Sequence, residues 1–117
     1  MALTQEHSAR KFKRITPEQV REAFKNTGLV PKKHTFGDGR TCGCAITAIA
    51  VESKPGCHRN FYDFVESMGY DGEYLYYFIN GFDGKNNINF LKLSEIYLIG
   101  YRDGEAARRL IFMEGNK

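Results

Sequence analysis

The sequence predicts a mainly α-helical fold: a compact single domain of four to five short helices around a buried segment at residues 42–51. A length of 117 residues with 42% hydrophobic residues is typical of one globular domain. Apolar residues recur at helical spacing in several segments, which are separated by glycines and by Asp-Gly pairs typical of turns and helix ends. The alternative is an α+β domain, and a small β-hairpin near residues 32–41 is compatible with both.

The chain is expected to begin with a flexible basic tail at residues 1–15, followed by one globular domain at residues 16–117. The tail segment has no apolar period and no helix cap. Order should begin at Thr16, a good N-cap that is followed by proline and, three residues later, by Gln19. The first helix should end at Gly28, because glycine readily takes the positive φ found just after a helix.

Residues 29–41 contain a proline and the turn sequence GDGR, which is typical of a loop or a short hairpin arm. Residues 42–51 are apolar on every side and should form a central buried element. Their alanine content and length favour a helix capped by Thr41. Ile46, Val51 and other β-branched residues leave a strand open as the second interpretation.

Two further helices are expected on either side of the sequence GYDG. The first begins after Asn60 and ends at Gly69, and the second starts near Asp71. A last helical segment should follow at residues 94–113. If it is unbroken, Asp103 lies in its apolar stripe and needs a partner. If it breaks shortly before Asp103, that residue is simply an N-cap.

The lack of a long apolar run and the number of cysteines indicate a soluble cytoplasmic protein without a membrane partner. No apolar run is long enough for a membrane helix or a secretory signal, and an odd number of cysteines, three, argues for reduced thiols. Residues 1–59 hold 11 Lys and Arg against 5 Asp and Glu, while residues 60–117 hold 6 against 9. The two halves should therefore attract each other or present opposite faces.

Three cysteines and one histidine are candidates for metal or thiol chemistry. Cys42, Cys44, Cys57 and His58 could hold zinc only in a loop conformation, because a helix points residues two apart to opposite sides. Cys42 could be a catalytic nucleophile if it lies in the first turn of a helix, where the helix dipole and Arg40 favour a thiolate. Burial in the core is the competing interpretation, and no metal or cofactor is expected.

Three aspartates could form a cation site or an acid/base cluster if the joints that hold them converge in space. They are Asp71, Asp83 and Asp103, with Glu73 and Glu105 close by in the sequence. The competing interpretation gives them turn and cap roles. Asp83 and Asp103 are the catalytic or ligand-binding candidates of this group.

The basic tail offers a separate mode of binding. Arg10, Lys11, Lys13 and Arg14, with Phe12 among them, could bind nucleic-acid phosphates without reading a base sequence. A solvated tail is the competing interpretation, since the net charge of the chain is only +3.

The aromatic residues favour an interface in the second half of the chain, which holds 13 of the 16 Phe and Tyr. Tyr74, Tyr76 and Tyr77 are the candidate interaction residues. They point in three directions on a helix, so one core cannot cover them all. Tyr76 should lie opposite the stripe of Tyr74, Tyr77 and Phe78 and contact a partner.

Three short glycine-rich motifs carry a family resemblance. They are TCGCA at residues 41–45, YFINGFDG at 77–84 and GYRDGEAA at 100–107. Together they make residues 16–113 resemble a loose group of small uncharacterised bacterial proteins. The resemblance implies a free-standing bacterial or phage-encoded domain, and it implies no activity, ligand or catalytic residue.

These observations favour a small interaction or regulatory protein, without enzymatic activity, that self-associates through its tyrosine-rich half. The first alternative is an enzyme or small-ligand-binding domain that uses Cys42, Asp83 or Asp103. The second is nucleic-acid binding through the basic tail. The sequence contains no phosphate-loop or dinucleotide-binding motif and no recognisable Ser-His-Asp set.

Overall fold

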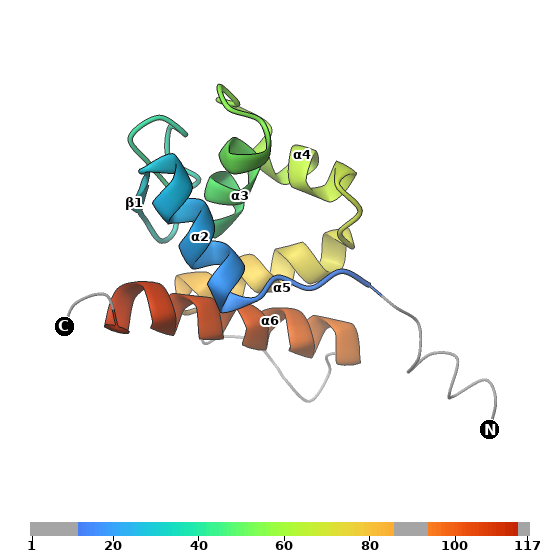
Figure 1. Cartoon of the computed structure of the whole chain (residues 1–117). Helices are drawn as coiled ribbons and strands as arrows, with labels where there is room; N and C mark the ends of the chain where they lie inside the picture. The colour runs from blue at the N-terminus through green and yellow to red at the C-terminus, as the bar shows by residue number, and fades with distance from the viewer. Residues whose placement is uncertain (1–11, 86–93, 115–117) are drawn as a thin grey trace.

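The computed structural model describes residues 12–85 and 94–114, and helices make up most of this part of the chain. Five α-helices, α2 to α6, lie in these ranges, with one two-stranded sheet between α2 and α3. Figure 1 shows α5 and α6 side by side, with α2, α3 and α4 on one side of this pair. The mainly α-helical class with a small β element is therefore confirmed.

Helix α2 (Pro17–Thr27) has the N-terminus that its sequence predicts. The Thr16 hydroxyl accepts a hydrogen bond from the Gln19 backbone N–H at 3.1 Å, and the Gln19 side chain accepts one from the Thr16 N–H at 2.9 Å. This reciprocal pair satisfies two N–H groups that a helix start leaves free. The helix ends at Gly28, which takes a φ of 75°.

The strands β1 (Val30–Pro31) and β2 (Cys42–Gly43) pair in parallel, with Val30 opposite Cys42. A hairpin pairs its arms in antiparallel fashion, so of the two interpretations left open for this segment, a loop or a hairpin arm, the structure has the loop. Residues 32–41 form the loop that returns the chain to the start of a parallel strand.

Asp38 organises this loop. Its carboxylate accepts hydrogen bonds from the backbone N–H groups of Arg40, Thr41 and Cys42 at 2.9, 2.8 and 3.1 Å, and from the Thr41 hydroxyl at 2.8 Å. These donors, led by the Thr41 N–H, hold the pKa of Asp38 well below its ordinary value of 3.8. The turn therefore leads directly into β2.

Helix α3 (Ala45–Ser53) is the central buried element, since all of its residues from Ala45 to Ala50 are buried. Its N-cap is Cys44, so the expected cap at Thr41 and the expected helix start at residue 42 are wrong. Pairing with β1 keeps Cys42 and Gly43 extended, and the Asp38 turn binds the N–H of Cys42. The helix can begin only after this strand.

Helices α4 (Phe61–Ser67) and α5 (Gly72–Asp83) meet at the expected GYDG joint. Asp71 is the N-cap of α5, because its carboxylate accepts from the N–H groups of Glu73 at 2.8 Å and Tyr74 at 3.0 Å. Gly84 ends α5 with a φ of 78°. The joint directs α5 away from α4 and towards α6.

Helix α6 (Glu95–Arg108) is unbroken and continues as the π-helical turn η2 (Arg109–Glu114). Asp103 therefore lies inside the helix, and its interpretation as an N-cap is wrong. Gly100 lies against the Tyr74 carbonyl on α5, and Gly104 lies against the Phe78 carbonyl. Because both residue numbers increase together, α5 and α6 run parallel.

The parallel pair is closely packed because glycines remove side chains from the contact. A Cβ atom added at Gly104 would lie 2.0 Å from the Phe78 carbonyl oxygen, and one at Gly81 would lie 2.0 Å from the Tyr101 carbonyl oxygen. The contact between α5 and α6 is the most extensive one between described elements. The residues of the candidate site described below lie largely on these two helices.

Residues 12–15 pack against the helices, which corrects their assignment to a tail. Ile15 is only 1% exposed, and the Phe12 ring centroid lies 5.6 Å from that of Tyr74. The ordered domain therefore includes this segment, whose packing partners are distant in sequence. The tail prediction for residues 1–11 lies outside the described residues.

Among the described residues, no helix is both long enough and apolar enough to cross a lipid bilayer.

Candidate functional site

Tyr76 on α5 is the most exposed aromatic side chain among the described residues. It is 54% exposed, whereas Tyr74 and Phe78 are completely buried. The expectation that Tyr76 lies opposite a stripe of Tyr74, Tyr77 and Phe78 therefore holds for Tyr74 and Phe78. It is wrong for Tyr77, whose ring contacts that of Tyr76. The prediction that Tyr74 is an interaction residue is wrong, because a buried ring cannot belong to an interaction surface.

Two further tyrosines extend the exposed ring into a row, called here the tyrosine row (Tyr76, Tyr77 and Tyr97). The rings of Tyr76 and Tyr77 meet edge to face, with centroids 5.1 Å apart. Tyr77 stacks on Tyr97 of α6, with centroids 4.8 Å apart and an interplanar angle of 17°. Both are favourable aromatic geometries, so neighbouring rings hold Tyr76 in place. The sequence does not indicate that Tyr97 belongs to this row, because Tyr97 lies on α6 and the other two tyrosines lie on α5.

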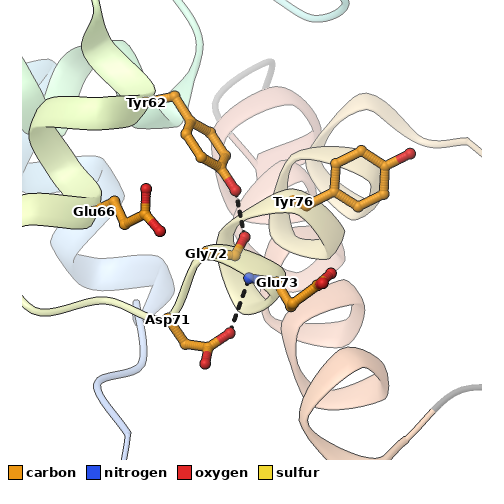
Figure 2. A pocket seen from close by; sticks show the side chains of 6 residues that line it. All are labelled: Tyr62, Glu66, Asp71, Gly72, Glu73 and Tyr76. Atoms are coloured by element: carbon orange, nitrogen blue, oxygen red, sulfur yellow. Dashed lines mark hydrogen bonds between the residues drawn. The ribbon is translucent and has the colours of Figure 1, made fainter.

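A surface hollow of about 500 Å³ adjoins Tyr76 where α4 approaches the start of α5. It is called here the acidic hollow, and its lining residues are Tyr62, Glu66, Asp71, Gly72, Glu73 and Tyr76. In Figure 2 these side chains surround Gly72, with Tyr62 and Tyr76 on two sides. The Tyr62 hydroxyl donates a hydrogen bond to the Gly72 carbonyl oxygen. This hydrogen bond joins α4 to the start of α5, and the hollow lies beside the tyrosine row.

The acidic hollow concentrates negative charge. Glu66, Asp71 and Glu73 form no ion pair with a basic side chain anywhere in residues 12–85 and 94–112. Burial raises the pKa of the Tyr62 hydroxyl, and the charges of Glu66 and Glu73 raise it further. A partner with positive charge therefore complements this surface best.

The cysteines do not form the sites predicted for them. Cys42 lies in β2, half-buried, and is not in the first turn of a helix. No group of three or more His, Cys, Asp or Glu in the described part of the chain has the geometry to hold a metal ion. Cys42, Cys44, Cys57 and His58 are therefore not brought together as zinc ligands.

The Cys44 thiol is a buried hydrogen-bond donor. Its Sγ lies 3.7 Å from the Thr47 hydroxyl oxygen, whose own proton is donated to the Phe36 carbonyl at 2.6 Å. The thiol must then supply the proton of the first contact. Burial raises the pKa of Cys44, which keeps the thiol protonated.

Alkylation should distinguish the cysteines. In the folded protein, we expect Cys44 to react with iodoacetamide at least ten times more slowly than Cys42, because a thiolate at a fully buried position is both disfavoured and inaccessible. Mass spectrometry of timed samples measures both rates, and unfolding in urea should make them similar. Equal rates in the folded protein would contradict the buried position of Cys44.

The three candidate aspartates lie apart. Asp71 and Asp83 occupy opposite ends of α5. Asp83 is buried and accepts a hydrogen bond from the His34 backbone N–H at 2.8 Å, while the His34 Nδ1 atom lies 4.0 Å from its other oxygen. Asp103 binds Arg14 and Tyr74 instead. Because no three acidic, His or Cys side chains of the described residues gather at one point where they could hold a metal ion, the predicted carboxylate cluster is wrong. Asp83, His34 and Cys44 line a small cavity of about 120 Å³.

Asp103 is the centre of a group called here the Asp103 cluster (Arg14, Tyr74 and Asp103). Arg14 donates two hydrogen bonds to the carboxylate, at 2.9 and 2.8 Å, and the Tyr74 hydroxyl donates a third at 2.6 Å. The Tyr74 hydroxyl oxygen also accepts from the Ile15 N–H at 2.7 Å. Burial, followed by the bond to Asp103, raises the pKa of Tyr74, so the hydroxyl keeps its proton. The cluster binds residues 12–15 to α5 and α6.

The basic residues of the predicted tail divide into two groups. Arg14 is paired with Asp103, and Lys13 donates to the Met68 carbonyl at 2.8 Å while its Nζ atom lies 4.7 Å from the Tyr70 ring centroid. Both serve the packing of the domain. Arg10 and Lys11 lie outside the described residues.

Comparison with protein-family models, with curated proteins and with solved structures gives no match to this chain. The resemblance to small bacterial proteins therefore stays a prediction.

Proposed function

We propose that this chain is a small, non-enzymatic interaction protein of the cytoplasm that self-associates through the tyrosine row. The observation that carries the proposal is the exposed ring of Tyr76, held against Tyr77 at the edge of the acidic hollow. Three free thiols support a reducing compartment.

Tyrosine suits this role because its ring buries a large apolar area while its hydroxyl can still form hydrogen bonds. Interface residues that contribute most to binding are enriched in Tyr, Trp and Arg and lie near the centre of a contact. The stacking of Tyr77 on Tyr97 restricts the neighbouring rings before a partner arrives. Binding would therefore order few additional side chains, which favours affinity.

Tyr76→Ser is expected to weaken self-association by at least tenfold, because it removes the exposed ring and leaves the buried face of α5 intact. A tenfold loss corresponds to about 1.4 kcal/mol, a modest effect for a central interface residue. Sedimentation velocity across a micromolar concentration series measures the change. Val30→Ser is the matched control, since Val30 is 56% exposed and lies on β1, away from the tyrosine row.

Two results would contradict the proposal. A wild-type protein that stays monomeric into the high micromolar range does not self-associate. A Tyr76→Ser protein with an unchanged dissociation constant would show that the ring is ordinary surface.

A further inference from the structure

A second hollow, of about 520 Å³, lies where the loop before α4 meets the start of that helix. Its rim is the loop at residues 54–60, called here the basic loop, which carries the exposed side chains of Lys54, His58 and Arg59. Asp63 and Phe64 of α4 complete the lining, and the Lys54 Nζ atom lies 5.8 Å from the Phe64 ring centroid. Two permanent positive charges thus face one carboxylate.

The two hollows are on different faces of one helix. Tyr62 and Glu66 of α4 line the acidic hollow, while Asp63 and Phe64 line the basic one. Residues 62 and 66 are one helical turn apart and share a face, and residue 64 is rotated by about 200° from residue 62, with residue 63 between these directions. One molecule therefore presents opposite charges in different directions.

Symmetric pairing of two tyrosine rows would be opposed by charge. An isologous contact brings the same patch of each copy together, so Glu66, Asp71 and Glu73 of one copy would approach the same carboxylates of the other. Like charges placed across an interface are unfavourable. A contact between the acidic hollow and the basic loop is attractive on balance, because Lys54 and Arg59 outnumber Asp63.

We propose, building on the self-association proposed above, that the basic loop of one copy docks on the acidic hollow and Tyr76 of the next copy. Arg59 and Lys54 would approach the carboxylates, and an arginine or lysine side chain can also lie against the Tyr76 ring in a cation–π contact. The contact is heterologous, and its two halves lie on different faces of α4. A heterologous contact repeats from one copy to the next, so the assembly grows into a ring or an open chain.

The test uses two variants that each destroy one half of the contact. Glu73→Lys reverses a charge in the acidic hollow and leaves the basic loop intact. Arg59→Glu reverses a charge in the basic loop and leaves the acidic hollow intact. Circular dichroism confirms the fold of each variant, and sedimentation velocity at low salt gives the mass of each alone and of the equimolar mixture.

Each variant alone is expected to be monomeric, whereas the mixture should form at least a 1:1 dimer. In that dimer, the intact basic loop of Glu73→Lys meets the intact acidic hollow of Arg59→Glu. Wild-type mass should rise with concentration and fall as salt is added, because salt screens exposed charges.

The outcomes separate the two proposals. A wild-type protein that associates while the mixture stays monomeric overturns the head-to-tail contact but leaves self-association standing. Association that is lost in Glu73→Lys and kept in Arg59→Glu also overturns it, because the acidic hollow then has another occupant. A monomeric wild-type protein overturns both proposals.

Discussion

Gly104→Ala is expected to lower the free energy of unfolding by about 3 kcal/mol, the upper end for inserting one methyl group into a packed contact. The new Cβ atom would lie 2.0 Å from the Phe78 carbonyl oxygen and 2.8 Å from the Phe82 backbone nitrogen. Both atoms belong to the backbone of α5, so no side-chain rotation can make room and the helices must separate. Alanine favours a helix over glycine by only about 1 kcal/mol, which is smaller than the clash.

Urea unfolding followed by circular dichroism measures this change. Gly72→Ala is the matched control, because its Cβ would meet the Glu66 carboxylate at 2.5 Å, and this flexible side chain can move away. We expect the control to retain stability to within about 1 kcal/mol. A Gly104→Ala protein as stable as the wild type would show that α5 and α6 are further apart than described.

Asp103→Ala is expected to destabilise the fold by about 2–4 kcal/mol, because it leaves the buried Tyr74 hydroxyl and the Arg14 guanidinium without their shared acceptor. Most of the loss should come from Tyr74, which is completely buried, since the Arg14 side chain is 55% exposed and its charge can be solvated. Arg14→Ala should therefore cost less than about 1 kcal/mol.

Asp103→Asn is the conservative control for this substitution. Its amide oxygen can still accept the Tyr74 hydrogen bond, so we expect it to lie between the wild type and Asp103→Ala in stability. Thermal unfolding of the three variants and the wild type gives the ranking. An Arg14→Ala protein less stable than Asp103→Ala would mean that the ion pair, and not the tyrosine, holds the cluster together.

Local signals predict much of this fold. The helix starts at Thr16 and Asp71 follow from side-chain caps, and the ends at Gly28 and Gly84 follow from the positive φ that glycine tolerates. The start of α3 could not be predicted in this way. It depends on strand pairing with β1, which is a contact between distant segments, and alanine content near residue 45 indicates a helix without locating its first turn.

The same division applies to the candidate site. Helical geometry alone places Tyr76 opposite a buried stripe, so its exposure is predictable. The acidic hollow could not be predicted from the sequence, because it forms only where Tyr62 and Glu66 of α4 approach the start of α5. Asp103 shows most clearly what local sequence cannot predict. Its neighbours in the sequence fit both an N-cap and a carboxylate inside a continuous helix, and only its contacts with the distant residues Tyr74 and Arg14 distinguish the two.

The Asp103 cluster also constrains when the protein can finish folding. Its hydrogen bonds join residues that are 89 positions apart for Arg14 and 29 apart for Tyr74. Contacts with such long sequence separation require closure of large loops, and they slow folding compared with contacts between neighbouring helices. During synthesis, moreover, residues 12–15 emerge from the ribosome long before residue 103 exists. Residues 12–15, which are made early, are therefore among the last to reach their native position.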